Sequence, residues 1–272
     1  MTVDRKIVLI TGAAAGIGLE AVKALVGSQH ASYDILLSAR KLAQAQAAAE
    51  DITRDFPSTV SIVTPLEIDV SSDKSIEEAA DLIQSRYGRI DVLVNNAGLL
   101  PDFSVASGQL SLREGWSKAW DINVTSSHVM THTFAPLLLR SNDPRLLFIT
   151  SSTSTLVGTE NGDLPTNKPS NRGWPKTQMR TMVPSYRCAK TGLNMMMRLL
   201  REWHRMLSDD GVKTWAVSPG FLATRLGGDQ DANKKMGAGD PALGGGFIKD
   251  IIEGKRDGDI GKAITRDGVQ PW

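Results

Sequence analysis

The chain has 272 residues, 41% of them apolar and 22% charged, which is the composition of an ordinary globular domain with a full core. Its net charge of +1 offers no strong field to nucleic acid or a membrane surface, and no apolar stretch is long enough to span a bilayer. A single cysteine, Cys188, excludes an internal disulfide and a cysteine-based zinc site. The polar residues 1–6 leave no room for a signal peptide before the first apolar run, so we expect a cytosolic (cytoplasmic) protein.

Short apolar runs alternate with helical patterns along the chain. The predicted strands lie within residues 7–10, 35–37, 60–68, 92–94, 146–149 and 212–217. The predicted helices lie at residues 16–29, 42–55, 72–86, 112–139 and 186–207. Strands that are apolar throughout indicate a parallel sheet covered on both faces. We therefore predict one α/β domain over residues 1–272, with a Rossmann-type, doubly wound parallel sheet of about seven strands between two helix layers.

Two stretches interrupt this alternation. Residues 158–184 are rich in Pro, Gly, Asn and Thr, and residues 221–246 contain many glycines. A long irregular loop in a compact domain is usually functional or disordered. We interpret the first stretch as an insertion and the second as a mobile flap over the substrate, with plain surface loops as the alternative for both.

The first strand is followed by a glycine-rich turn. Residues 11–18 read Thr-Gly-Ala-Ala-Ala-Gly-Ile-Gly and lead directly into the first helix. Glycines permit positive φ angles and let a pyrophosphate approach the backbone, and the free N–H groups at the helix start attract its charge. Glycines also serve close strand–helix packing, but a position between a buried strand and a helix indicates a dinucleotide site.

The second strand ends in Leu-Ser-Ala-Arg-Lys at residues 37–41, where the adenosine ribose of a dinucleotide would lie. No acid is present to bind the ribose 2′-hydroxyl of NAD, whereas Arg40 offers a planar fork suited to the 2′-phosphate of NADP. Ser38 could add a hydroxyl donor. The alternative is that Arg40 and Lys41 simply begin a solvated helix. On this chemistry we predict NADP(H) as the cofactor.

Tyr186 and Lys190 lie four residues apart on a predicted helix and therefore share a face. A tyrosine hydroxyl ionises near pH ~10, and we expect the Lys190 ammonium to lower the pKa of Tyr186. The hydroxyl could then give a proton to a carbonyl oxygen or take one from an alcohol. Taken alone, the same spacing also fits an ordinary amphipathic helix surface.

Together these motifs resemble those of the short-chain dehydrogenase/reductase family. The family's glycine signature is Thr-Gly-x-x-x-Gly-x-Gly, its Asn-Asn-Ala-Gly matches residues 95–98, and its Tyr-x-x-x-Lys matches residues 186–190. Its Pro-Gly after the sixth strand matches Pro219 and Gly220. The motifs follow the family's order over nearly the whole chain, so the resemblance implies a nicotinamide-dependent oxidoreductase.

The resemblance also implies roles that residue types alone would not identify. Ser152, just past the fifth strand, takes the place of the serine that holds the substrate oxygen, with Ser151 and Ser154 as close competitors. Asn123 takes the place of a helix asparagine that holds a water near the lysine, and the plain alternative is an exposed helix Asn. Asp69 resembles the family's adenine-contacting acid, although it could equally belong to a helix N-cap.

The predicted catalytic residues are Asn123, Ser152, Tyr186 and Lys190. The predicted cofactor-binding residues are Gly12, Ala14, Ala15, Gly16, Ile17, Gly18, Ser38, Arg40, Asp69, Val70, Asn95, Ala97, Gly98, Tyr186, Lys190, Pro219, Gly220, Leu222 and Thr224. The candidates for an apolar substrate pocket are Leu99, Leu100, Phe103, Leu156, Val157, Phe221 and Leu222. No metal site is predicted, because His128 and His132 share a helix face without an acidic third ligand nearby in sequence.

More residues separate Ser152 from Tyr186 than in most of the family. Monomeric carbonyl reductases of the family carry similar insertions, which cover the helix surface that other members use to dimerise, and residues 173–175 and 268–272 also look like that branch. The resemblance thus implies an NADPH-dependent reductase of a hydrophobic ketone or aldehyde, a monomer or weak dimer, with no nucleic-acid or membrane partner. The alternatives are an NADP-linked alcohol or steroid dehydrogenase working toward oxidation, and a non-catalytic NADP(H) sensor. The retained Tyr, Lys and Ser favour an enzyme.

Overall fold

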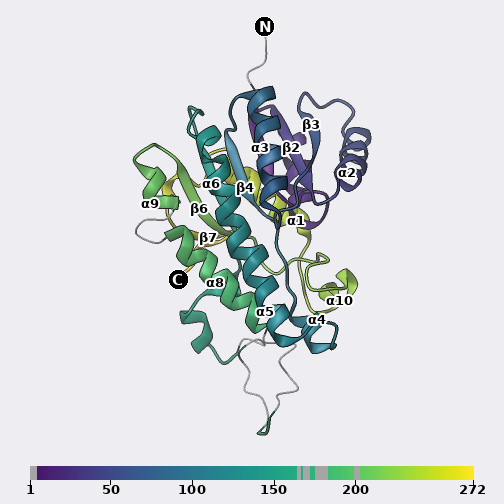
Figure 1. Ribbon diagram of the computed structural model, residues 1–272, viewed down its shortest axis with the longest axis vertical. Helices are drawn as coiled ribbons and strands as arrows, with labels where there is room; N and C mark the ends of the chain where they lie inside the picture. The colour runs from purple at the N-terminus through teal and green to yellow at the C-terminus, as the bar shows by residue number, and fades with distance from the viewer. Residues whose placement is uncertain (1–4, 164–166, 168–171, 175–182, 199–202) are drawn as a thin grey trace.

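A twisted sheet runs through the centre of the molecule (Figure 1). The computed structural model describes residues 5–163, 167, 172–174, 183–198 and 203–272. Within these residues the sheet has eight strands in the order β3-β2-β1-β4-β5-β6-β7-β8. The strands are β1 (Lys6–Ile10), β2 (Tyr33–Ala39), β3 (Ile62–Glu67), β4 (Val92–Asn95), β5 (Arg145–Ile149), β6 (Lys213–Ser218), β7 (Ala263–Thr265) and β8 (Gly268–Val269). All neighbouring pairs are parallel except β7 and β8, which are antiparallel.

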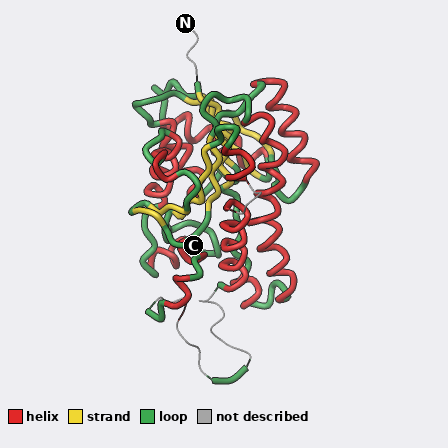
Figure 2. The backbone as a smooth tube through the Cα atoms, turned by 90° about the vertical axis from the view of Figure 1, so that its left-hand side faces the viewer, coloured by secondary structure: helices red, strands yellow, loops and turns green. Residues whose placement is uncertain are grey.

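Helices cover both faces of the sheet, which is why the central strands are apolar throughout. On one face lie α1 (Gly16–Val26), α2 (Leu42–Asp55) and α11 (Pro241–Ile252), packed against strand residues such as Val8 and Ile10. On the other lie α3 (Asp73–Tyr87), α6 (Ser126–Leu138) and α8 (Pro184–Arg198), packed against residues such as Leu9 and Leu36. Figure 2 shows the yellow strands between the two groups of red helices. None of the helices in the described ranges has the length and apolar character needed to cross a bilayer.

Shorter elements surround the carboxyl ends of the strands. They are α4 (Asp102–Ala106), α5 (Leu112–Trp120), the π-helical η1 (Asp121–Thr125), the 3₁₀ turns η2 (Ser152–Ser154) and η3 (Val157–Glu160), and α10 (Gln230–Lys235). Two further short elements are the helix α9 (Trp203–Ser208), which precedes β6, and the 3₁₀ turn η5 (Asp257–Asp259), which precedes β7. From β1 the chain proceeds to β2 and β3 on one side and crosses to β4 on the other. Ligands of open α/β sheets bind at such a reversal of strand order, next to the carboxyl ends of the strands.

The predicted fold class is confirmed, and the differences lie in its details. The sheet has eight strands rather than about seven. The prediction fell short because β7 and β8 are too short to appear as apolar runs in the sequence. The predicted helix over 112–139 consists of α5, η1 and α6 in succession. The predicted helix over 186–207 corresponds to α8 and α9, with residues 199–202 outside the described part.

The two irregular stretches are also partly accounted for. Of the predicted insertion 158–184, residues 164–166, 168–171 and 175–182 lie outside the described residues. The predicted flap 221–246 contains α10 and the first half of α11, and a β-bridge between Leu222 and Gly239 closes it at its base. The bridge joins two parts of the segment itself, and α11 attaches the segment to the rest of the protein by packing against α1.

Candidate active site

The turn after β1 has the backbone shape of a diphosphate cradle. Gly12 and Gly16 have φ angles of 62° and 57°, in the left-handed region that favours glycine. A Cβ atom on Gly12 would lie 3.1 Å from the Cα atom of Ala97, so a side chain would crowd the neighbouring loop. The N-cap residue of α1, Ala15, makes no side-chain cap bond to the first N–H groups of the helix. These residues fit a dinucleotide whose phosphates satisfy those N–H groups.

Hydrogen bonds join the glycine turn to the loop after β4. The Thr11 hydroxyl oxygen accepts the backbone N–H groups of Asn96 (2.9 Å) and Ala97 (3.0 Å). The Asn96 side chain donates in return to the carbonyl oxygens of Thr11 (2.7 Å) and Gly12 (3.2 Å). A Cβ atom on Gly18 would lie 2.5 Å from the same Asn96 nitrogen, so Gly18 makes room for this link. The two loops therefore form one unit although about 85 residues separate them.

Asn95 has a structural part in this loop, and its predicted contact with the cofactor stays a prediction. Its side chain is buried and donates to the Thr131 hydroxyl on α6 at 3.0 Å, so it ties β4 to a covering helix. Two other predicted residues of this loop lie closer to the site. Ala97 lies beside the glycine turn, and Gly98 lies beside the Lys190 Nζ.

At the adenosine end, the structure separates Ser38 from Arg40. The Ser38 hydroxyl is fully buried and donates to the Ile10 carbonyl at 3.1 Å, which corrects its expected role as a phosphate donor. The Ser38 carbonyl instead accepts the N–H of Ala13 in the glycine turn. Arg40 is exposed at the end of β2. The NADP prediction therefore depends on Arg40 alone.

Asp69 lies at the turn before α3. Its carboxylate accepts the backbone N–H (3.0 Å) and the hydroxyl (2.7 Å) of Ser71, while the N-cap of α3 is Ser72. Asp69 thus shapes the turn that precedes the helix, and the neighbouring Val70 packs against the core. A contact with adenine stays a prediction for both residues.

Tyr186 and Lys190 share the buried face of α8. The Lys190 side chain is 3% exposed; its Nζ donates to the Ile149 carbonyl at 2.7 Å and lies 5.7 Å from the centre of the Tyr186 ring. Burial lowers the pKa of Lys190 to about 7. Burial also raises the pKa of Tyr186 to about 12, against the opposing effect of a hydrogen bond with Ser151. The expected lowering of the Tyr186 pKa by Lys190 is therefore wrong, because desolvation penalises the charged form of each group.

The serine beside Tyr186 is Ser151, not the predicted Ser152. The Ser151 side chain lies close enough to Tyr186 to lower the pKa of its hydroxyl, whereas Ser152 is exposed at the start of η2. Successive residues at a strand end point in opposite directions. Thr150 turns inward, where its hydroxyl donates to Asn194 at 2.6 Å, and Ser151 accordingly faces the site. The structure therefore favours Ser151, one of the two competitors of Ser152 in the prediction, as the serine that could contact a substrate oxygen.

Asn123 is fully buried in η1, so the alternative of an exposed helix Asn is wrong. Its Nδ2 donates to the carbonyl oxygens of Leu99 and Ala119, both at 2.8 Å, and its Oδ1 accepts the Leu99 N–H at 3.2 Å. A Cβ atom on Gly98 would lie 3.1 Å from this Oδ1 and 3.6 Å from the Lys190 Nζ. Asn123 therefore holds the loop after β4 next to Lys190.

The segment after β6 lies against the glycine turn, and its contact with the cofactor stays a prediction. Gly220 has a φ angle of 106°. The methyl group of Thr224 lies 3.5 Å from the position that a Cβ atom would take on Gly16. Leu222 packs with Ile17 around Gly244 of α11 and is only 5% exposed. Leu222 is therefore part of the core rather than a pocket residue.

Several other pocket candidates are exposed apolar side chains. Leu156, Val157 and Phe221 are 65%, 59% and 55% exposed, which is unusual for side chains of their size. Leu100 and Phe103 lie against Gly227, since a Cβ atom there would meet both side chains. The loop after β4 thus contacts the 221–246 segment.

Two buried side chains that the sequence analysis missed contact the catalytic candidates. Asp102, at the start of α4, accepts three hydrogen bonds from Ser185 and Tyr186. Gln270 donates to the Ser151 carbonyl at 3.2 Å. Asp102 and Ser185 are 83 residues apart, and Ser151 and Gln270 are 119 apart, so no local sequence pattern could have identified either contact.

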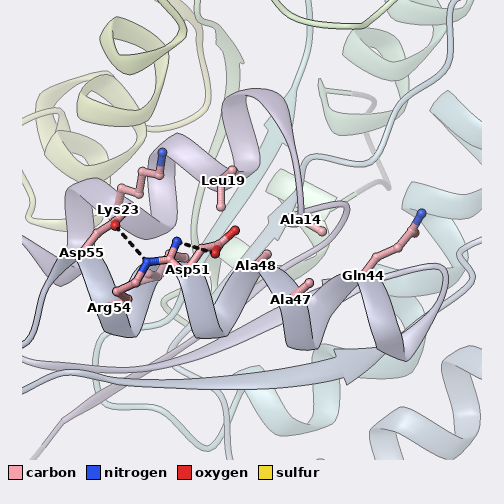
Figure 3. A pocket seen from close by; sticks show the side chains of 10 residues that line it. Ala14, Leu19, Lys23, Gln44, Ala47, Ala48, Asp51, Arg54 and Asp55 are labelled. Atoms are coloured by element: carbon pink, nitrogen blue, oxygen red, sulfur yellow. Dashed lines mark hydrogen bonds and ion pairs between the residues drawn. The ribbon is translucent and has the colours of Figure 1, made fainter.

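A surface groove between α1 and α2 is a separate feature (Figure 3). Its volume is about 370 Å³, and it touches the glycine turn only at Ala14. Lys23, Gln44, Asp51 and Arg54 line it, and Arg54 pairs with Asp51 at 2.6 Å. None of the catalytic candidates lines this groove.

Comparisons with known proteins agree with this arrangement. The family profile described as short chain dehydrogenase matches residues 6–162. The short-chain dehydrogenase/reductase tropE of Talaromyces stipitatus is 43% identical over 274 residues, which covers 99% of this chain and 98% of that protein. The short-chain dehydrogenase/reductase eupG of a Phoma species is also 43% identical, over 98% and 97% of the two chains.

Solved structures share the fold. The NADPH-bound carbonyl reductase from chicken fatty liver has a TM-score of 0.75 at 21% identity, covering 98% of this chain and 99% of that one. The carbonyl reductase Sniffer of D. melanogaster also has a TM-score of 0.75 at 21% identity, covering 99% and 100%. The chain belongs to the short-chain dehydrogenase/reductase family and is a nicotinamide-dependent oxidoreductase of the kind that acts on CH–OH and C=O groups.

Proposed function

We propose that this protein is an NADPH-dependent reductase of an apolar ketone or aldehyde, with Tyr186 as the proton donor. The observation that carries the proposal is the grouping of Tyr186, Ser151 and Lys190 at the carboxyl edge of the sheet. The Ser151 side chain lies close enough to the Tyr186 hydroxyl to act on its pKa, and Lys190 follows one helical turn later on the same buried face.

The residues can divide the reaction between them. When bound, the reduced nicotinamide supplies a hydride to the carbonyl carbon. Ser151 donates a hydrogen bond to the carbonyl oxygen and stabilises its growing negative charge. Tyr186 gives its proton to the same oxygen. A pKa of about 12 keeps the Tyr186 hydroxyl protonated at neutral pH, which is the state that a proton donor needs.

Lys190 and Asn123 hold the surroundings of the reacting groups. Lys190 is anchored to the Ile149 carbonyl, which leaves further N–H bonds of an ammonium for the nicotinamide ribose. Asn123 fixes the Leu99 backbone and thereby the loop next to the Lys190 Nζ. The backbone of residues 12–18 would bind the diphosphate.

The preference for NADPH rests on Arg40, since the end of β2 carries no acid for the ribose 2′-hydroxyl of NAD. Three structural relatives support it by their own ligands. The chicken carbonyl reductase and an L-sorbose reductase from Gluconobacter frateurii hold NADPH, and an alcohol dehydrogenase from Thermococcus sibiricus holds 5-hydroxy-NADP. The exposed Leu156, Val157 and Phe221 support an apolar substrate. We further propose a monomer or weak dimer.

The test mixes the protein with NADPH or NADH and a panel of apolar and polar carbonyl compounds, and follows the absorbance of the reduced nicotinamide. We expect turnover with NADPH in preference to NADH. In Tyr186→Phe we expect turnover to fall by about 10²-fold or more with NADPH binding retained, because the variant loses only the proton donor. Binding of NADPH without turnover of any carbonyl by the wild-type protein would contradict the proposal.

A further inference from the structure

A buried carboxylate holds the start of the helix that carries Tyr186. Asp102 is 7% exposed. Its Oδ1 accepts the Ser185 N–H at 2.9 Å, and its Oδ2 accepts the Ser185 hydroxyl at 2.9 Å and the Tyr186 N–H at 3.1 Å. One of the three donors is thus the backbone of the predicted proton donor itself.

The position of Asp102 suits a carboxylate rather than a neutral acceptor. α8 begins at Pro184, so Ser185 and Tyr186 carry the first free N–H groups of a 15-residue helix. The positive end of the helix dipole adds to the attraction, and hydrogen bonds to an ionised acceptor are about twice as strong as neutral ones. An asparagine would turn an N–H₂ group toward one of the backbone N–H groups, and that bond would be lost.

The chain enters α8 under strain. Val183 has a φ angle of 38°, a left-handed conformation that a β-branched residue rarely adopts. Such strain persists only where the surrounding contacts determine the conformation, and it is concentrated at functional sites. The three bonds to Asp102 begin two residues after Val183 and hold the start of the helix that follows it.

Asp102 also connects Tyr186 to the other side of the site. It follows directly on the loop that Asn123 holds through Leu99, and its neighbour Phe103 contacts Gly227 of the segment after β6. The helix that presents Tyr186 and the loop that faces Lys190 therefore meet at a single carboxylate.

We infer that Asp102 is a positioning residue that sets the depth and orientation of Tyr186 over the substrate carbonyl. The inference rests on the proposed function of Tyr186 as proton donor. It assigns to α4 a task in the reaction that the family motifs do not cover.

The test compares two variants with a matched control. Asp102→Asn removes the charge and at least one backbone bond, and Ser185→Ala removes one of the three bonds but keeps both backbone ones. The control is Asp91→Asn. Asp91 is another buried carboxylate, which accepts from the Ile7 N–H (2.7 Å) and the Ser141 hydroxyl (2.6 Å), but it precedes β4 at the opposite edge of the sheet.

We expect Asp102→Asn to lower kcat by about tenfold to a hundredfold, since a displacement near 1 Å at a reacting group has effects of that size. The dissociation constant of NADPH should stay within about twofold of the wild-type value. Tyr186 is the one predicted cofactor-binding residue to which Asp102 is hydrogen-bonded among the described residues. The deuterium isotope effect on hydride transfer should rise as chemistry limits the rate. Ser185→Ala should lower kcat by less than about threefold, and Asp91→Asn should leave kcat unchanged while lowering the melting temperature.

A second readout does not require turnover. The carbon-13 resonance of the Tyr186 Cζ, assigned by its absence in Tyr186→Phe, should not titrate below about pH 11 in the wild-type protein. In Asp102→Asn we expect its pKa to fall toward the ordinary value near 10, because the displaced hydroxyl is less completely desolvated. The control should titrate like the wild-type protein.

The outcomes separate the two proposals. If the wild-type protein reduces no carbonyl, the proposed function fails, and the Cζ titration alone decides the role of Asp102. If Asp102→Asn keeps the wild-type kcat, or if its titration is unchanged, the positioning role is overturned. An equal loss of kcat in Asp91→Asn would overturn it as well, since the effect would then be one of general destabilisation.

Discussion

Ser151 and Ser152 are adjacent in sequence but face different surroundings. The Ser151 side chain lies close enough to Tyr186 to act on its pKa, and the Ser151 carbonyl accepts hydrogen bonds from Gln270 and Ser154. Ser152 is exposed at the start of η2. The two hydroxyl groups are chemically alike, so their position in space alone decides which one can contact a substrate oxygen.

This difference predicts unequal effects of two small substitutions. Ser151→Ala should lower kcat by about 10²-fold, because it removes a hydrogen bond aimed at the developing oxyanion. Ser152→Ala should change kcat by less than about twofold, as expected for an exposed side chain. Steady-state kinetics with NADPH in excess measures both, and the reverse ranking would show that Ser152 is the reacting serine after all.

Packing between α1 and α11 connects the cofactor cradle to the rest of the protein. A Cβ atom on Gly245 would lie 2.7 Å from the backbone nitrogen of Ala21 and would also clash with the carbonyl group of Glu20. The two helices therefore approach each other as closely as backbones allow. Since the glycine turn leads into α1, any shift of this helix moves the proposed diphosphate site.

Neighbouring glycines in α11 provide a sharp test of this contact. Gly245→Ala should destabilise the protein by about 1–3 kcal/mol, because α1 or α11 must move, and it should also weaken NADPH binding. Gly246→Ala meets nothing within 4 Å and should be neutral or stabilising by up to about 1 kcal/mol through helix propensity. Chemical denaturation and NADPH titration measure both effects; equal behaviour of the two variants would rule out the tight contact.

η1 shows how a local irregularity places a side chain. A π-helical turn interrupts the path from α5 to α6, and such turns are frequent at functional sites. Here it contains Asn123, whose side chain reaches both Ala119 on the same helix and Leu99 across the site.

Across the whole molecule, the two edges of the sheet have different tasks. At the amino edge, Arg145 is 3% exposed and pairs with Asp143 and Asp257, and Lys213 bridges the same two carboxylates. At the carboxyl edge, Tyr186 and Lys190 are buried, and desolvation is the main cause of both pKa shifts. No charged group of the described residues contributes to either shift. The charged network stabilises one edge, while the other keeps buried ionisable groups at a cost in stability.

The burial of Lys190 and Tyr186 predicts how the free energy of unfolding changes with pH. The ordinary pKa of Lys190 is 10.5, and burial lowers it to about 7 in the folded protein. Between these values the unfolded chain binds a proton that the folded protein does not, so the free energy of unfolding rises with pH. This contribution is complete above 10.5 and is lost as the pH falls through 7. Tyr186 acts oppositely: between pH 10 and about 12 the folded protein holds a proton that the unfolded chain has lost, so the free energy of unfolding falls as the pH rises.

We therefore expect the free energy of unfolding, measured without cofactor between about pH 7 and pH 9.5, to increase by up to about 1.4 kcal/mol per pH unit from Lys190 alone. Lys190→Met should flatten this dependence. Lys262→Met, at a lysine whose side chain is 47% exposed, should leave it unchanged. A wild-type profile that is flat in this range would mean that Lys190 is protonated in the folded protein.

The sequence alone determined the features that depend on neighbouring residues. Alternating apolar runs and helical periods predicted a doubly wound sheet, because burial on both faces requires apolar strands. The glycine turn, the loop at 95–98 and the pair Tyr186–Lys190 could be recognised because each motif lies within one turn or one helix.

Contacts between distant segments were decided by the tertiary structure. The direction in which Ser151 faces depends on the exact end of β5, and the bonds of Asp102 to Ser185 and Tyr186 span more than 80 residues. Packing also buried the Ser38 hydroxyl and reversed the expected shift of the Tyr186 pKa. Desolvation is a property of everything that surrounds a group, so it can be assessed only after the chain has folded.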